Sequence, residues 1–225
     1  MDINRFYTLI EIIGTIAFAS SGTMIAIRKG MDFFGIIVLA LITALGGGVF
    51  RDIILGITPP TAFLKTTYTK VAIIVAILII FILKISNGKK FLDQKYLTKY
   101  VKLMSFLDAV GLGIFTVSGV NLAMKMGHGA NTYLLVFVGI VTGCGGGVLR
   151  DVCSGTIPII FTKNTIYAMA SFLGALSYIL IRPYTIKYSY IIGASVTIIT
   201  RLFAMKYRWS LPNVNSDLIE DAPDQ

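Results

Sequence analysis

Charge is scarce in this chain: of its 225 residues only 14% are Asp, Glu, Lys or Arg, about half the share in a soluble domain. The chain also has a single histidine, His128, and only two cysteines, Cys144 and Cys153. These are too few ligands for a metal site, and small cysteines need no role beyond packing. No nucleophile–base pair and no cofactor motif occurs in the sequence. We therefore expect no metal, no cofactor and no enzyme activity.

The charge that is present is mostly positive, with a formal net charge of +9. A nucleic-acid-binding domain collects its basic residues on one face. Here they fall in short loops between apolar segments, above all in KISNGKKFLDQKYLTKYVK (Lys84–Lys102). Loops of this kind set the orientation of membrane helices and contact anionic lipid. We expect membrane lipid, anionic lipid included, as a partner and no nucleic acid.

Long apolar runs fill most of the remaining chain, and 56% of the residues are hydrophobic. Runs such as VAIIVAILIIFIL (Val71–Leu83) are too continuous for surface helices, and runs approaching ~20 residues indicate membrane spans. The predicted fold class is an all-α integral membrane protein with seven transmembrane helices. Their expected bounds are Phe6–Ile27, Phe33–Ile57, Tyr68–Leu83, Phe106–Met124, Thr132–Thr156, Ile166–Ile181 and Tyr190–Met205.

One short motif occurs twice. LGGGVFRD (Leu45–Asp52) returns ninety-nine residues later as CGGGVLRD (Cys144–Asp151), and a glycine and a proline follow both copies at the same distances. Upstream, EIIGTIAFASSGTMIAIRKG (Glu11–Gly30) aligns with DAVGLGIFTVSGVNLAMKMG (Asp108–Gly127), ninety-seven residues later. The difference of two residues places an insertion near His128. The chain is thus a duplicated three-span unit followed by one extra span.

Each unit has an odd number of spans, so the second copy must enter the membrane inverted. The predicted order is a first repeat (1–83), a basic loop (84–102), a second repeat (103–181), a seventh helix (182–208) and a disordered acidic tail (209–225). The loops on one side carry most of the Lys and Arg residues. By the positive-inside rule the basic loop and the C-terminus are cytoplasmic and the N-terminus is outside, in a protein of the plasma membrane.

The second and fifth spans each contain a glycine triplet: Gly46, Gly47 and Gly48 in one, and Gly145, Gly146 and Gly147 in the other. A glycine in a helix interior costs about 1 kcal/mol relative to alanine, so the triplets favour a bent, unwound turn. Lipid cannot satisfy unwound backbone, so such a bend must face protein or a water-filled cavity. Its freed carbonyls would replace part of the hydration shell of an ion. The alternative is that the glycines let two helices pack closely.

An arginine and an aspartate follow each triplet, as Arg51–Asp52 and Arg150–Asp151. The inverted repeat places the two pairs at opposite ends of the membrane. We therefore expect two charged vestibules on either side of a glycine-lined waist, because charged groups at this depth mark a pathway. The alternative is that each pair is an interfacial salt bridge with a structural role.

Spans one and four carry a second set of matched positions, a carboxylate and a serine in each copy. Their spacing keeps them on one helical face. Such a face fits the lining of a pathway, and it fits a tight helix contact equally well. The candidate lining residues are Glu11 and Ser21 in one copy, Asp108 and Ser118 in the other and, one turn before the glycines, Thr43 and Thr142.

The duplicated motifs GGGVFRD and GGGVLRD, in a chain with seven spans, resemble the prokaryotic branch of the trimeric intracellular cation (TRIC) channels, whose bacterial members also carry a glycine-transporter domain label. The resemblance covers Phe6–Met205. It implies a homotrimer with one pore per subunit for monovalent cations, chiefly potassium. It also implies that the glycine-kinked second and fifth helices shape the pore, with both triplets and the residues Arg51, Asp52, Arg150 and Asp151.

Two functions stay open at this point. A cation channel needs a continuous polar path. A carrier for a small neutral amino acid such as glycine needs a half-helix N-terminus for the carboxylate and an acceptor for the ammonium group, and Gly46–Arg51 with Asp52 offers both. A structural or regulatory membrane subunit would carry neither flux. We expect a potassium channel, with the glycine transporter as the alternative.

Overall fold

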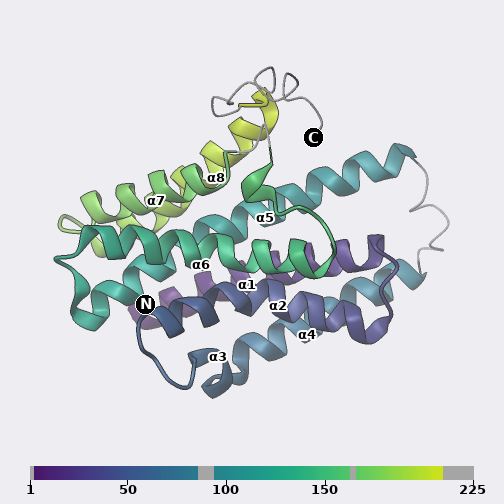
Figure 1. Cartoon of the computed structure of the whole chain (residues 1–225), viewed down its shortest axis with the longest axis horizontal. Helices are drawn as coiled ribbons and strands as arrows, with labels where there is room; N and C mark the ends of the chain where they lie inside the picture. Colours follow the sequence, from purple (N-terminus) through teal and green to yellow (C-terminus); the bar gives the residue numbers. More distant parts are fainter. Residues whose placement is uncertain (1–2, 86–93, 163–165, 210–225) are drawn as a thin grey trace, which may run out of the picture.

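The computed structural model (Figure 1) describes residues 3–85, 94–162 and 166–209, and the regular elements in these ranges are all helices. Six helices are long and apolar enough to cross a membrane, and α7 is a shorter apolar helix of 14 residues. The predicted all-α membrane fold with seven apolar helices is therefore confirmed. The helices are α1 (Ile3–Arg28), α2 (Phe33–Ile54), the short α3 (Thr61–Leu64), α4 (Thr66–Ile85), α5 (Gln94–Ala123), α6 (Thr132–Cys153), α7 (Ala168–Ile181) and α8 (Ile186–Tyr207).

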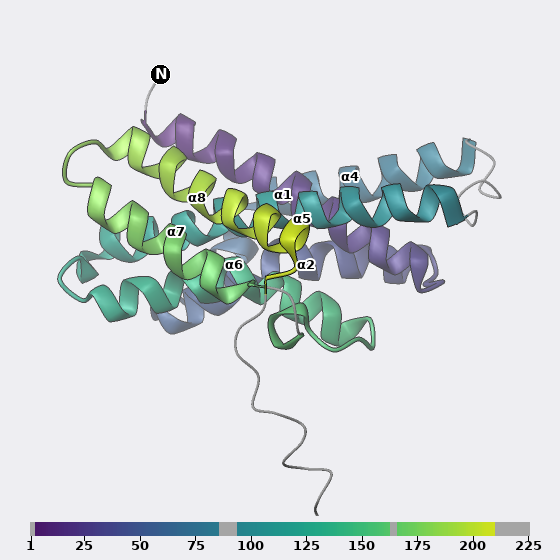
Figure 2. The same ribbon diagram turned by 90° about the horizontal axis from the view of Figure 1, so that it is seen from above.

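Four helices form the centre of the bundle, where α1 packs against α5 and α2 packs against α6. α4 covers α1 and α2, and α7 covers α5 and α6 in the same way. α8 packs against α5 and α7 and has no counterpart in the first repeat. Figure 2 shows α7 and α8 side by side on one flank of the bundle. The fold is thus two matching three-helix units with one helix added to the second.

The turns show the duplication most clearly. Gly30 and Gly127 have φ angles of 70° and 93°, and Gly56 and Gly155 have φ angles of 73° and 66°. Positive φ angles favour glycine because it lacks a Cβ, which explains why both members of each pair are glycine. A π-helical turn at Met124–His128 ends the second copy of the first helix. It lies where the alignment of the repeats places the two-residue insertion.

The two copies are inverted relative to each other. At one end of the bundle, the ammonium group of Lys125 near the end of α5 lies 4.3 Å from the ring centre of Tyr7 near the start of α1. At the other end, the Tyr100 hydroxyl near the start of α5 donates to the carbonyl oxygen of Met24 near the end of α1, at 2.8 Å. α1 and α5 therefore run antiparallel, as an inverted repeat requires.

The predicted basic loop is shorter than expected. Residues 94–102 are the first turns of α5 rather than loop, because Tyr100 is buried against the end of α1 and gives this segment a packing partner. The rest of that loop, residues 86–93, and residues 210–225 of the predicted acidic tail lie outside the described residues. The other predicted helix ends agree with the structure to within a few residues.

The glycine triplets do not break their helices. α2 and α6 continue as α-helix through both triplets, so the prediction of an unwound turn is wrong. A Cβ added at Gly47 would overlap the carbonyl oxygen of Thr142, and one added at Gly146 would overlap that of Thr43. The glycines therefore let the two helix backbones cross in direct contact, which is the close-packing alternative.

Candidate functional site

A cavity of about 300 Å³ opens at the end of the bundle where α1 begins. α1 lines it with Thr8, Glu11 and Thr15, which share one face of the helix because they are three or four residues apart. α5 lines the opposite side with Ser118 and Asn121. The cavity thus lies between the first helices of the two repeats, with α2, α3 and α4 closing its other sides.

Glu11 is the carboxylate of this cavity, and both of its oxygens accept hydrogen bonds. The Tyr68 hydroxyl donates to Oε2 at 2.6 Å, and the Ser118 hydroxyl donates to Oε1 at 2.5 Å. Ser118 belongs to the second repeat, so this site joins the two copies. Two exposed lysines, Lys65 and Lys125, also line the cavity. Charged groups of both signs therefore face the same space.

Arg51 of the first motif faces the cavity as well, with 11% of its side chain exposed. Its Nε donates to Asp52 Oδ1 at 2.8 Å, and its Nη2 donates to the Thr61 hydroxyl at 3.3 Å. Asp52 is fully buried, and its Oδ2 accepts the amide and the hydroxyl of Thr61 at 2.7 and 2.6 Å. These bonds tie the end of α2 to the start of α3. Asp52 thus orients Arg51 and anchors the loop, and does not line a vestibule.

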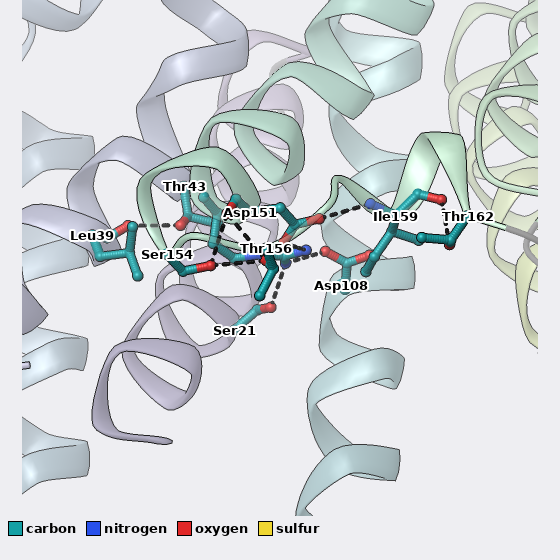
Figure 3. Close-up of polar contacts among 10 residues, drawn as sticks. Ser21, Leu39, Thr43, Asp108, Asp151, Ser154, Thr156, Ile159 and Thr162 are labelled. Atoms are coloured by element: carbon teal, nitrogen blue, oxygen red, sulfur yellow. Dashed lines mark hydrogen bonds and ion pairs between the residues drawn. The ribbon is translucent and has the colours of Figure 1, made fainter. Parts of the chain in front are cut away.

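The second motif lies in a buried cluster made of Ser21, Asp108, Arg150 and Asp151. Arg150 is completely buried, and its Nη1 donates to Asp108 at 2.5 Å and to Ser21 at 2.7 Å. Its Nε donates to Asp151 at 2.9 Å, and the other oxygen of Asp151 accepts the Ile159 amide at 2.9 Å. Figure 3 shows Ser21 and Asp108 reaching this place from two different helices. Arg150 therefore connects α6 to α1 and α5.

Along α1 and α5, two phenylalanine rings lie between the residues of the cavity and those of the buried cluster. Phe18 lies one turn before Ser21 on α1, and Phe115 lies on α5 between Asp108 and the part of the helix that lines the cavity. The ring centres are 5.3 Å apart. Phe115 reaches the cavity, whereas Phe18 is buried beneath it.

A second buried arginine lies near the buried cluster. Arg201 of α8 is 3% exposed, and its guanidinium carbon lies 4.9 Å from the ring centre of Tyr167. Burying charge is costly unless opposite charge compensates it. This part of the bundle contains two buried cations, Arg150 and Arg201, and two buried anions, Asp108 and Asp151. The four charges balance in number.

Comparison with known proteins identifies the family. The family described as Glycine transporter matches the chain twice, over residues 8–84 and 105–183, which are the two repeats. The UPF0126 inner membrane protein YadS of Escherichia coli K12 is 34% identical over 212 residues, covering 92% of this chain and 96% of the relative. The UPF0126 membrane protein YvgT of Bacillus subtilis is 30% identical over 208 residues, covering 92% of this chain and 96% of the relative.

Solved structures agree with this match. A crystal structure of a prokaryotic TRIC channel is similar with a TM-score of 0.81 at 32% identity, covering 92% of this chain and 100% of that chain. The TRIC orthologue from Rhodobacter sphaeroides is similar with a TM-score of 0.79 at 28% identity, covering 91% and 99%. The chain belongs to the TRIC family. It is a multi-pass membrane protein, and its solved relatives are trimeric cation channels rather than enzymes.

Membership of the TRIC family confirms the resemblance drawn from the two motifs, and the structure divides the predicted residues into three sets. The open cavity contains Glu11, Gly48, Arg51 and Ser118, with Asp52 buried behind Arg51. The buried cluster contains Ser21, Asp108, Arg150 and Asp151, with Gly147 beside it. The helix crossing contains Gly46, Gly47, Gly145 and Gly146. The expectation of two charged vestibules is therefore wrong, because the first motif borders a cavity only through Arg51 and the second motif is buried.

The two threonines that precede the glycines have no place in the lining. The hydroxyls of Thr43 and Thr142 donate to the carbonyl oxygens of Leu39 and Val138 in their own helices, at 2.6 Å in both cases. Both threonines are buried at helix contacts. Their prediction as lining residues is wrong because the backbone four residues earlier satisfies each hydroxyl.

The site predicted from the sequence of this TRIC chain did not include Tyr68, Tyr167 or Arg201. Tyr68 binds Glu11, and Tyr167 stands beside the buried cluster. Extending the repeat alignment beyond the two prolines places Tyr68 on Tyr167, ninety-nine residues later, so a signal for this pair exists in the sequence. Arg201 has no such signal, because α8 lies outside the repeat.

Proposed function

We propose that this protein is a channel for monovalent cations, above all potassium, with one conducting path inside each subunit of a homotrimer. The observation that carries the proposal is a line of carboxylates and hydroxyls between α1 and α5. Glu11 lies in the open cavity and Asp108 in the buried cluster, and the rings of Phe18 and Phe115 and the guanidinium of Arg150 lie between them. The likeness to solved TRIC cation channels supports the same function.

In such a channel, the arrangement around Arg150 corresponds to the closed state. Arg150 occupies the position beside Asp108 that a permeating cation would take, and it is held there by three side chains. The rings of Phe18 and Phe115 fill the waist, and apolar constrictions of this kind block ions by excluding water. Opening therefore requires both that Arg150 leaves Asp108 and that the rings separate.

The orientation follows from the charge of the loops. The end of the bundle that contains the buried cluster is also the end where α1 finishes with Arg28 and α4 finishes near Lys84. By the positive-inside rule this end faces the cytoplasm, where its basic residues contact anionic lipid. The open cavity then faces outside, and the membrane is the plasma membrane.

A carrier for glycine is the second candidate, and one observation favours it. Arg51 and Glu11 face the same cavity while the other end of the path is closed. A cation beside a carboxylate suits a zwitterion, and one open and one closed end suit alternating access. The carrier predicts saturable transport, whereas the channel predicts currents.

Reconstitution into liposomes separates the two functions. Purified protein is tested for potassium efflux and, in parallel, for uptake of labelled glycine, with Glu11→Gln as the variant that removes the carboxylate from the cavity. The proposal expects potassium efflux that falls in Glu11→Gln, most strongly at low ionic strength, because a fixed charge raises the local cation concentration there. Saturable glycine uptake without potassium current would contradict the channel and support the carrier.

A further inference from the structure

The two ends of the proposed path contain the same set of side chains. Each has a carboxylate on the first helix of its repeat, a tyrosine near the start of the third helix and an arginine after the glycine triplet. Each also has a serine from the other repeat. The first set is Glu11, Tyr68, Arg51 and Ser118, and the second is Asp108, Tyr167, Arg150 and Ser21.

The carboxylates of the two sets have different partners. At the open end, Glu11 accepts the hydroxyl of Tyr68, and Arg51 stays with its neighbouring aspartate. At the closed end, Asp108 accepts Arg150. Tyr167 is 2% exposed, and its hydroxyl has no hydrogen-bond partner among the described residues. One set therefore pairs the carboxylate with tyrosine, and the other pairs it with arginine.

We propose that Tyr167 is the alternative partner of Asp108 and that the closed end opens when Asp108 exchanges Arg150 for the Tyr167 hydroxyl. The first set already shows this arrangement at the end that is open. The inference rests on the proposed conducting path, because it describes how that path opens.

Two buried atoms at this end could form the new hydrogen bond. Within the described residues, Asp108 Oδ2 and the Tyr167 hydroxyl both lack a hydrogen-bond partner. Asp108 and Arg150 are among the charged groups that act electrostatically on that hydroxyl. A buried polar group without a partner is costly. A hydrogen bond between the two atoms would give both a partner. It would also replace part of the stabilisation that Asp108 loses when its bond to Arg150 breaks.

The glycine triplets give the tyrosine its present position. A Cβ added at Gly147 would lie 2.6 Å from the Tyr167 hydroxyl, so the hydroxyl rests against this glycine. At the matching Gly48 a Cβ would meet only Arg51, at 3.8 Å, because the hydroxyl of Tyr68 lies on Glu11 instead. The two tyrosines thus show two positions, one on the glycine and one on the carboxylate.

Arg201 holds the Tyr167 ring in place during the exchange. Its guanidinium stacks on the Tyr167 ring, and its Nε and Nη1 have no hydrogen-bond partner in the described part of the chain. When Arg150 leaves, Arg201 remains as a cation on the Tyr167 ring. It is a positioning residue that holds the ring and supplies the positive charge that the open arrangement keeps.

Two substitutions with opposite expected effects test the exchange in single-channel recordings. Tyr167→Phe removes only the hydroxyl, so it should lower the open probability about tenfold to a hundredfold, the factor that a hydrogen bond to a charged group contributes. It should not lower thermal stability, because that hydroxyl has no partner in the closed structure. Gly147→Ala should raise the open probability, because the new methyl group displaces the hydroxyl from its present position against this glycine. An unchanged open probability in Tyr167→Phe, or a lower one in Gly147→Ala, would overturn the inference.

Matched variants at the other end and on α8 separate the exchange from general damage. Tyr68→Phe removes a bond that exists in this structure, so it should lower thermal stability where Tyr167→Phe does not. Arg201→Gln should lower the open probability, whereas Lys206→Gln, an equal charge change at an exposed position of α8, should not. An effect of Lys206→Gln as large as that of Arg201→Gln would assign the change to net charge and contradict the positioning role.

A chemical measurement keeps this test independent of ion flux. Ser21→Cys, in a chain without Cys144 and Cys153, places a thiol in the buried cluster that a water-soluble reagent reaches only when this end opens. Adding Tyr167→Phe should slow its modification by the same factor as it lowers the open probability. If the wild-type chain carries no current but this rate still falls, the channel function fails and the exchange stands. If currents are present and the rate is unchanged, the exchange fails and the channel function stands.

Discussion

Replacing Gly47 with alanine should destabilise the protein, although alanine is the better helix former. The new Cβ would overlap the backbone carbonyl of Thr142 on α6, and a backbone atom cannot rotate away as a side chain does. The two helices must therefore separate. Overpacking of this kind costs about 1–3 kcal/mol, and the higher helix propensity of alanine offsets about 0.5–1 kcal/mol of it. We expect a net loss of about 1 kcal/mol in the free energy of unfolding.

Gly48 provides the matched control one residue later in the same helix. A Cβ there would meet only the end of the Arg51 side chain, at 3.8 Å, so Gly48→Ala should gain the propensity term of roughly 0.5–1 kcal/mol. The two variants should thus differ by about 2 kcal/mol, or about 4–8 °C in melting temperature for a chain of this size. Thermal unfolding of the purified protein in detergent, at one scan rate, measures this difference.

The inverted repeat adds a further condition to the same experiment. Gly146→Ala should resemble Gly47→Ala, because its Cβ would overlap the carbonyl of Thr43. The double variant should lose less stability than the sum of the two single variants, because the first alanine already separates the helices that the second must separate. If Gly47→Ala melts at the same temperature as Gly48→Ala, the two backbones are not in contact. That result would favour the bend that the sequence predicted.

Three further predictions concern the aspartates, the waist and the orientation. Asp151→Asn should lower the free energy of unfolding by about 3–5 kcal/mol, because it removes one of the anions that compensate the fully buried Arg150. Asp52→Asn should lower it less, because Arg51 is partly exposed. Equal losses of stability in chemical denaturation would contradict this difference in burial. Phe18→Ala should widen the waist and raise the unitary conductance in bilayer recordings, and a conductance equal to that of wild type would remove the ring from the path. Cysteines introduced at Asn87 and Asn215, both outside the described residues, should resist impermeant thiol reagents added to intact cells, whereas labelling of both would reverse the orientation.

The fold was largely predictable from the sequence. Continuous apolar runs define the membrane helices because the bilayer sets their length. The matched motifs define the repeat, and the glycines at the turns mark positions where the backbone needs a positive φ angle. None of these signals depends on a tertiary contact. The helical start of α5 at Gln94 was missed because it depends on a distant contact, the one between Tyr100 and the end of α1.

The site was less predictable, because identical motifs lie in different surroundings. Arg51 and Arg150 follow nearly the same residues in the sequence, yet one lines a cavity and the other is completely buried. The two arginines differ because Glu11 of α1 accepts a tyrosine hydroxyl, whereas Asp108 of α5 accepts Arg150. No pattern in the neighbouring sequence predicts these partners. α8 adds Arg201 to the second copy alone and makes the copies unequal. The glycines were ambiguous for a similar reason, since bending and close packing need the same residues.

Single-channel recording of Arg150→Gln beside Arg51→Gln in planar bilayers with potassium tests whether Arg150 closes the path. Arg150→Gln should raise the open probability, because it removes the cation that is paired with Asp108. Arg51→Gln should not raise the open probability. Arg51 donates to Asp52 rather than to Glu11, and Glu11 accepts the Tyr68 hydroxyl. Should Arg150→Gln not assemble, Ser21→Ala removes one acceptor of the same guanidinium and should raise the open probability by a smaller factor. An open probability at or below that of wild type, in trimers of normal size, would contradict a path closed by Arg150.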